Sequence, residues 1–201
     1  MKNLPWQRNK FVKIDKEQAY DNLKLAQVVL DELSIPFFLS SGTLLGLFRN
    51  GDFIDHDEDI DLGVFIEHYD TKIISGFKRK GFFLVKVFGH EEEGLEISFT
   101  RGGVKLDIFF YYKEHNTMWH AVWYVNKYIN FRFLKNLGLV RAKLRKLSFP
   151  LFYSYSFIKF RDIKLPIPSN TEDYLIAQYG ENWRIPDKNW DNFTSQKNYI
   201  S

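Results

Sequence analysis

A turn of small residues lies just ahead of a dense group of carboxylates at the start of an apolar run, and this pairing constrains the chain most. The turn spans residues 40–46 and the carboxylates fall within residues 55–63. If residues 60–66 form a strand, Asp59 and Asp61 lie on one face, because side chains alternate and next-but-one Cα atoms are about 6 to 7 Å apart. Two carboxylates at that spacing can share one cation. Left unpaired, they would be driven toward their neutral forms, so the pattern favours Mg²⁺ or Mn²⁺.

Helical spacing precedes this motif. Asp15, followed by Gln18, is a capping pair, and the apolar residues after it recur with helical periodicity. We expect a helix that ends near Ser34 and then a short buried strand over residues 37–39. A second helix is expected over residues 43–49. Its first turn would present free N–H groups and a partial positive charge, which is the physical basis of an anion cradle.

The middle of the chain predicts a mixed sheet covered by helices. A helix is expected over residues 67–80, and strands are expected over residues 60–66, 82–88, 95–100 and 104–112. Residues 101–103 suit a tight hairpin between the last two strands.

The C-terminal third has a less regular pattern. Aromatic strand-like runs occur at residues 119–125 and 128–134, and a basic segment follows at residues 141–146. We expect a strand over residues 157–165, a short helix from Thr171 to Gly180, and a frayed polar tail after Trp190.

A third carboxylate falls inside the strand expected over residues 104–112. Leu106 and Ile108 share one face of that strand, so Lys105 and Asp107 point the other way. An uncompensated buried charge costs several kcal/mol, so Asp107 needs a partner. A metal ion or Lys105 could supply it.

Composition fits one folded unit with a substantial core. The chain has 201 residues, 45% of them hydrophobic, which favours a folded main body over a disordered one. The net charge of +3 indicates no particular partner.

The absence of cysteine excludes disulfides and thiolate metal sites and leaves the compartment open. No apolar run is long enough to span a bilayer, so we expect a soluble or peripheral protein.

Each of these candidate functional features could instead have a purely structural role. An Asp-x-Asp pair alone is often a solvated strand end, and residues 41–43 could be only a helix cap. The basic aromatic region at residues 141–161 could stack on nucleic-acid bases or rest on a membrane, but a packed hairpin is the favoured interpretation. The histidines show no metal-ligand spacing and are expected to be structural or exposed; they are His56, His68, His90, His115 and His120.

Three short motifs occur in a fixed order: SGTLLG at residues 41–46, DIDLG at 59–63 and KLDIFF at 105–110. Shorter similarities follow at residues 167–169, 174–175, 179–180 and 183–186. Together these segments resemble the fukutin and LicD-type family of the nucleotidyltransferase-fold superfamily, over roughly residues 37–190.

The resemblance implies an α+β, two-layer fold. Its expected core is a nucleotidyltransferase-like mixed β-sheet flanked by helices, with a C-terminal β-hairpin and a short helix. In that division, residues 1–36 are a helical segment packed on the core, residues 37–190 are the catalytic domain, and residues 191–201 are a tail.

The resemblance also implies an activity. Family members transfer a phosphorylated small alcohol from a CDP-activated donor to a glycan hydroxyl, with ribitol phosphate, glycerol phosphate and phosphocholine as the candidate groups. The implied partners are a CDP-linked donor and a glycan or polysaccharide acceptor, with a membrane surface or a glycosyltransferase nearby and no nucleic acid. A bacterial member would work in the cytoplasm, and a eukaryotic one in the Golgi lumen.

Residue roles follow from the same resemblance. Asp59, Asp61 and Asp107 would be catalytic and would bind Mg²⁺ or Mn²⁺, with Asp57 as a lesser candidate ligand. Zinc is disfavoured, because the family's cysteine-based zinc site has no counterpart in this sequence. The donor phosphates would be contacted by Ser41, Gly42, Thr43 and Arg49, the last on spacing alone.

Two other functions remain open from the sequence. A protein of this fold could transfer a nucleotide itself onto an acceptor. Alternatively, a non-catalytic module could bind a glycan or a partner enzyme through its aromatic surface, although such a module would have little use for three convergent acids.

Overall fold

The computed structural model describes residues 14–124, 143–187, 190 and 194–200. Its helices are α1 (Lys16–Glu32), α2 (Ser41–Asn50), the short 3₁₀ helix η1 (Ile66–His68), α3 (Lys72–Arg79) and α5 (Thr171–Tyr179). The strands of the N-terminal half are β1 (Phe38–Leu39), β2 (Asp59–Phe65), β3 (Phe83–Phe88), β4 (Glu96–Arg101) and β5 (Val104–Glu114). The later strands are β6 (Thr117–Tyr124), β7 (Lys143–Pro150), β8 (Tyr155–Phe160), β9 (Ile163–Pro168) and β10 (Tyr199–Ile200).

A mixed sheet forms the centre of the molecule, in the order β1-β2-β5-β6-β7-β10. β2 and β5 run parallel, while the other pairs in this path are antiparallel. β5 is long enough to pair with β4 along its first half and with β6 along its last residues, so the sheet branches there. β3 extends the branch beyond β4. This confirms the expected α+β fold with a mixed sheet.

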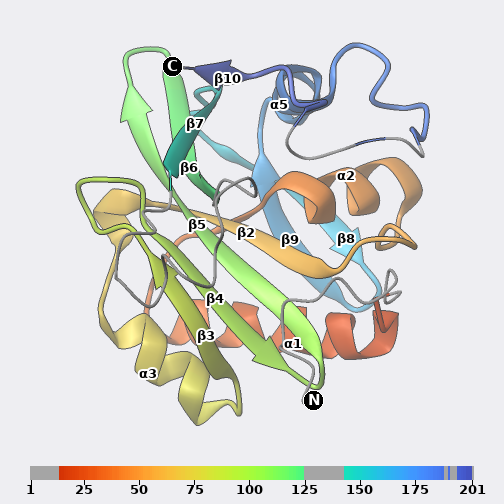
Figure 1. The fold of residues 1–201 in the computed structure, drawn as a ribbon. Coiled ribbons are helices and arrows are strands. Elements are labelled where there is room, and N and C mark those ends of the chain that lie inside the picture. The colour runs from red at the N-terminus through yellow and green to blue at the C-terminus, as the bar shows by residue number, and fades with distance from the viewer. Residues whose placement is uncertain (1–13, 125–142, 188–189, 191–193, 201) are drawn as a thin grey trace, which may run out of the picture.

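One face of the sheet is covered by α1 and α3, which Figure 1 shows along its lower side. The Asp15 side chain accepts hydrogen bonds from the backbone N–H groups of Glu17 and Gln18 and so begins α1 where the sequence predicted. The buried stripe of α1, which includes Leu23 and Leu30, packs against the apolar face of β2 and β5. The polar side chains of those two strands are therefore left on the opposite face.

α2 and α5 lie next to each other on the side away from α1 (Figure 1). The β8–β9 hairpin packs beside them through contacts of β8 with α2 and of β9 with β1 and α5. The helix predicted from Thr171 is therefore present, and the C-terminal part of the chain contains a hairpin, β8–β9. It is not the hairpin favoured for residues 141–161, because β7 pairs with β6 and β10 while β8 pairs with β9.

The hairpin joining β4 and β5 has the predicted geometry. Gly102 and Gly103 have φ angles of 60° and 81°, which is the pair of positive values that a type I′ turn requires. Arg101 pairs with Val104 across the turn.

Three further local predictions are wrong. The helix expected over residues 67–80 is divided into η1 and α3, because the Asp70 carboxylate accepts the backbone N–H of Lys72 and starts a new helix there. The single strand expected over residues 157–165 is two strands, reversed at Arg161 with a φ of 53°. The tail is not frayed at its end, since β10 pairs with β7.

Two predictions fall where the structure gives no description. The aromatic run at residues 128–134 lies outside the described residues, and so does the start of the basic segment at 141–142. The remainder of that segment is the beginning of β7. In the described part of the chain, no helix combines the length and apolar character needed to cross a bilayer.

Candidate metal centre

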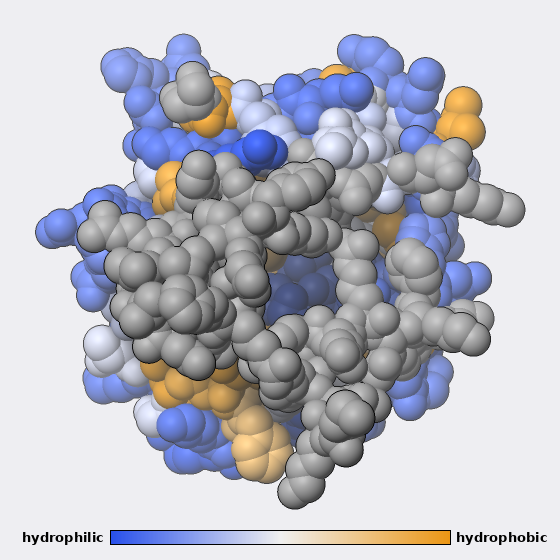
Figure 2. Space-filling view, in the orientation of Figure 1, coloured by the Kyte–Doolittle hydropathy of each residue, from blue (hydrophilic) through white to orange (hydrophobic). Residues whose placement is uncertain are grey.

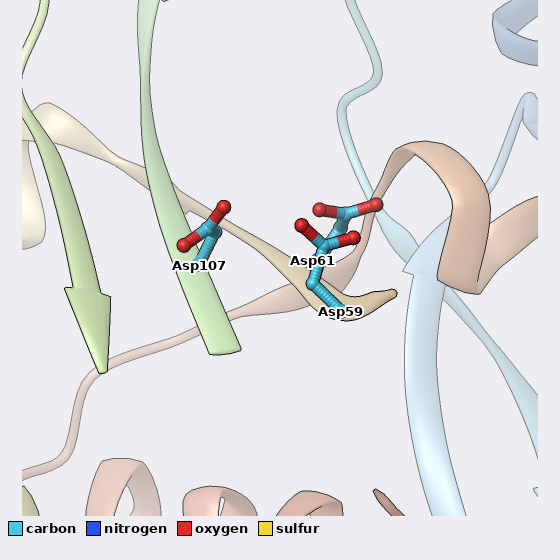
Figure 3. A group of neighbouring side chains, drawn as sticks. All are labelled: Asp59, Asp61 and Asp107. Carbon is cyan, nitrogen blue, oxygen red and sulfur yellow. The ribbon is translucent and has the colours of Figure 1, made fainter. Parts of the chain in front are cut away.

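Three aspartates from two neighbouring strands form an acidic group on the face of the sheet opposite α1. Asp59 and Asp61 lie on β2, and Asp107 lies on β5 directly beside Asp61 in the parallel register. One carboxylate oxygen of each lies within 4.8 Å of those of the other two. Figure 3 shows the three carboxylates turned to the same side of these strands, with α2 beside Asp61. The alternation of side chains along each strand therefore brings together the residues that the sequence singled out.

Figure 2 shows hydrophilic residues near the centre of the face drawn in Figure 1, over the position of β2. The side chain of Asp59 is 24% exposed, whereas that of Asp107 is only 4% exposed. A small ion or a phosphate could therefore reach the group from the side of Asp59.

The start of α2 holds Asp61 in place. The Gly42 backbone N–H donates a hydrogen bond to Asp61 Oδ2 at 3.0 Å, and the Asp61 N–H donates to Thr43 Oγ1 at 2.9 Å. The helix N-terminus thus points its partial positive charge at this carboxylate. The predicted anion cradle faces the acidic group, and the roles of Gly42 and Thr43 toward a donor phosphate stay predictions.

A buried hydroxyl network fixes the turn that leads into α2. Ser40 Oγ lies 2.7 Å from the Tyr111 hydroxyl and 3.0 Å from the Tyr174 hydroxyl, and these two hydroxyls are 2.6 Å apart. Next to them, Ser41 has a φ of 43°, in the left-handed region that non-glycine residues seldom occupy. The network therefore ties α5 and β5 to a strained residue at the edge of the site.

Asp57 lies close to the group without joining it. A Cβ atom added to Gly42 would come within 2.5 Å of Asp57 Oδ2, so this carboxylate rests directly against the glycine. Burial, with the nearby charge of Asp59 adding to it, raises the pKa of Asp57 to about 7. Its role as an additional ligand stays a prediction.

Among the residues that the structure describes, Lys105 brings positive charge to the site. Its Nζ lies 2.9 Å from Asp59 Oδ2 and 2.5 Å from Asp107 Oδ2, and so it joins the two strands. Burial alone would lower the pKa of Lys105, but the two carboxylates outweigh that effect and raise it. Lys105 is one of the two partners that the sequence analysis predicts for Asp107.

One lysine does not neutralise the group. Burial raises the pKa of Asp61 well above its ordinary value, and the charges of Asp59, Asp57 and Asp107 raise it further. Burial also raises the pKa of Asp107, although Lys105 opposes the effect. Asp107 Oδ1 has no hydrogen-bond partner among the described residues. The group therefore holds more negative charge than the described side chains compensate.

The residues present suit a hard divalent cation. All three potential ligands are carboxylates, which Mg²⁺ and Mn²⁺ prefer, and the described residues place no thiolate or imidazole in the group. The unpartnered Asp107 oxygen offers a free ligand atom. Asp59, Asp61 and Asp107 would hold the ion.

Arg49, another predicted phosphate contact, lies farther along α2 than the residues beside the acidic group. It stands eight positions after Ser41, about 12 Å along the helix axis. Its Nη1 donates to the Trp183 carbonyl at 3.2 Å, and its Nε donates to Asn50 Oδ1 at 3.0 Å. The described contacts of Arg49 are therefore with Trp183 and Asn50 and not with the acidic group, and its contact with phosphate stays a prediction.

Sequence reasoning missed Glu96, a buried carboxylate on β4. Its strand pairs with β5 so that Ser98 lies opposite Asp107, and Ser98 Oγ donates to Glu96 Oε1 at 3.4 Å. Burial, with a contribution from Asp107, raises the pKa of Glu96 to about 7. The signal was available, because Glu96 stands between Leu95 and Ile97 as Asp107 stands between two apolar residues.

Comparison with known proteins agrees with these motifs. Residues 34–170 match the family model described as LicD/FKTN/FKRP, nucleotidyltransferase domain. The chain is 38% identical to the ribitol-5-phosphate transferase FKTN of Mus musculus over 177 residues, and 37% identical to that of Homo sapiens over 177 residues. Each alignment covers 88% of this chain and 35% of the relative, so the chain spans about a third of the length of these proteins.

Among solved structures, the chain resembles ANT(2″)-Ia in complex with adenylyl-2″-tobramycin with a TM-score of 0.37 and 16% identity. That likeness covers 46% of this chain and 49% of the other and is too limited to support any statement about this protein.

Proposed function

The chain belongs to the LicD/FKTN/FKRP nucleotidyltransferase-domain family, and from that premise we propose that it is a metal-dependent phosphotransferase. Its reaction would move ribitol phosphate from CDP-ribitol to a hydroxyl group of a glycan. The name of the FKTN relatives supports ribitol phosphate as the first group to test, ahead of glycerol phosphate and phosphocholine.

The observation that carries the proposal is the register of β2 against β5. Because Asp61 lies beside Asp107, with Asp59 two positions earlier on the same face, the three carboxylates converge at one point. Convergence of this kind is costly without a cation, since like charges and burial both oppose ionisation. A protein that used the surface only for binding would gain nothing from it.

Phosphoryl transfer depends on positioning and on charge neutralisation at the phosphate oxygens. Mg²⁺ or Mn²⁺ held by the three carboxylates would supply that neutralisation and stabilise the departing CMP. Gly42 and Thr43 orient Asp61, and the N-terminus of α2 would add a favourable field for the diphosphate. Asp107 is our candidate for activating the acceptor hydroxyl, either directly or through the metal ion that it would help to hold.

The proposal is tested by CMP release. Purified protein is incubated with CDP-ribitol, CDP-glycerol or CDP-choline, a panel of glycans, and Mg²⁺ or Mn²⁺. We expect release with CDP-ribitol, loss of release in EDTA, and loss with Asp107→Asn. Asp162→Asn, an exposed carboxylate paired with Lys24, is the matched control and should release CMP at the wild-type rate.

The same assay separates the alternatives. A product heavier by a nucleotide would indicate nucleotide transfer, whereas a product heavier by a phosphoalditol supports the proposal. A binding module would retain its glycan affinity in Asp107→Asn and would release no CMP. Failure to bind any cytidine nucleotide in the presence of metal would contradict the proposal.

A further inference from the structure

We propose that Lys105 is a displaceable counter-ion: it occupies the acidic group in the metal-free protein, leaves it when a divalent cation binds, and then contacts the phosphates of the donor. This inference rests on the proposed function for the identity of the donor. Its first step concerns the metal alone and does not depend on any reaction.

The geometry places the Lys105 ammonium where a bridging ion would be bound. It contacts one oxygen of Asp59 and one of Asp107, so it joins β2 to β5 at the point where the three carboxylates converge. Asp59 and Lys105 are direct neighbours in the parallel register, which brings the lysine to this position without any long reach.

The ammonium and a divalent cation would compete for the same carboxylates. Lys105 contacts the Oδ2 atoms of Asp59 and Asp107, and magnesium would bind oxygens of the same two groups at about 2.0–2.1 Å, so the two cations would lie only a few ångström apart. Two cations that close repel strongly in a partly buried site. The carboxylates gain more from the doubly charged ion, so the lysine is the group that leaves.

Lys105 has the freedom to move. Its side chain is 36% exposed, and its flexible stem lets the ammonium turn without a change in the strand. The open side of the group, next to Asp59, is where an incoming diphosphate would lie. A displaced ammonium on that side would meet phosphate oxygens, so that metal binding prepares donor binding.

The test on the wild-type chain is amine labelling. Protein is pulsed with acetic anhydride in EDTA, in Mn²⁺, and in Mn²⁺ with CDP, and the modification of each lysine is measured by peptide mass spectrometry. We expect labelling of Lys105 to rise about fivefold or more with Mn²⁺, because its two ion pairs are lost. Labelling should fall again when CDP is added. Lys113 lies on the same strand as Lys105 and pairs with Glu67 of η1. It is the internal control, and its labelling should not change.

A variant gives the second readout. Removing the competing charge in Lys105→Met should tighten Mn²⁺ binding, measured by electron paramagnetic resonance without nucleotide, by about tenfold or more. The same variant, saturated with Mn²⁺, should bind CDP about fivefold or more weakly, because one phosphate contact is lost. Lys105→Arg keeps the charge and should resemble the wild type, as should Lys113→Met.

The outcomes are distinguishable. If Mn²⁺ binds and the labelling of Lys105 does not change, or if Lys105→Met binds Mn²⁺ no more tightly, the inference is overturned while the proposed function stands. If Lys105 responds as expected and no CDP-linked donor releases CMP, the proposed function fails and the inference stands. If Lys105→Met does not fold, the labelling of the wild-type chain decides.

Discussion

The carboxylate of Asp61 is buried among like charges, and burial with those charges raises its pKa well above the ordinary value. In Asp61→Asn the amide oxygen can still accept the Gly42 N–H, while the repulsion disappears. We therefore expect the metal-free variant to be more stable than the wild type by about 1 kcal/mol or more. The stabilisation by Mn²⁺ should be lost. Chemical denaturation in EDTA and in Mn²⁺ measures both effects.

Asp162→Asn is the control for this prediction. It removes an exposed ion pair with Lys24 and should change stability by less than about 1 kcal/mol in either condition. A destabilised Asp61→Asn that still responded to Mn²⁺ would contradict the assignment of Asp61 as a ligand.

The buried Glu96 carboxylate predicts how the stability of the fold depends on pH. Its pKa in the folded protein is about 7, above its ordinary 4.5, so the folded state holds this proton more tightly than the unfolded state. Its contribution to stability is therefore fully present below pH 4.5 and is lost as the pH rises through about 7. Glu96→Gln should flatten the free energy of unfolding across that window and should raise it at pH 8 by about 2–3 kcal/mol.

The control is Glu114→Gln at the exposed end of β5, which should leave the pH profile unchanged. The measurement is urea denaturation at a series of pH values in EDTA. If the free energy of unfolding varied with pH in the same way for the wild type and for Glu96→Gln, the buried carboxylate would have no part in the pH dependence.

At the scale of elements, α2 is the part of the fold that positions the site. In Gly42→Ala the new Cβ would meet Asp57 Oδ2 at 2.5 Å, the end of a side chain that can move. We expect a loss of stability below about 1 kcal/mol, with donor affinity reduced about tenfold because the carboxylates beside the helix start are displaced. Isothermal titration with CDP in Mn²⁺ measures the affinity.

Gly46→Ala, one turn later, is the matched control. Its Cβ would meet the Asp52 carbonyl oxygen at 2.8 Å, so backbone must shift. That variant should lose about 1–3 kcal/mol of stability and bind CDP normally when folded. The reverse pattern, with the donor effect at Gly46 instead of Gly42, would refute the role given to the helix start.

Sequence patterns predicted the elements that depend on local chemistry. The cap at Asp15, the glycine turn before β5 and the alternation that aligns Lys105 with Asp107 were all visible without the fold. The start of α3 was missed because the Asp70 carboxylate accepts the backbone N–H of Lys72 and so competes with a continuous helical pattern. The turn at Arg161 was missed because it carries neither glycine nor proline.

Contacts between distant elements could not be predicted in this way. The parallel pairing of β2 with β5 decides whether Asp61 meets Asp107, and no local pattern specifies which strands pair. The hydroxyl network of Ser40, Tyr111 and Tyr174 likewise joins three elements far apart in sequence. Fold assembly, and not spacing alone, completes the candidate site.

For the whole molecule, we expect a divalent cation to stabilise the fold. An ion that binds only the folded state adds about 2.7 kcal/mol at a concentration 100 times its dissociation constant. Mn²⁺ or Mg²⁺ should therefore raise the unfolding temperature, and Asp107→Asn should abolish most of the increase. Glu172, whose carboxylate pairs with Arg184 on the surface, supplies the control variant Glu172→Gln, which should respond to metal as the wild type does. An equal response from Asp107→Asn would show that the ion binds elsewhere.

We propose that Asp59, Asp61 and Asp107 together bind one divalent cation, and anomalous diffraction tests this most directly. Crystals soaked in Mn²⁺ should give an anomalous difference peak within bonding distance of all three carboxylates, with the Lys105 ammonium turned away from it. A well-ordered site without a peak, or a peak bound by other residues, would contradict the claim.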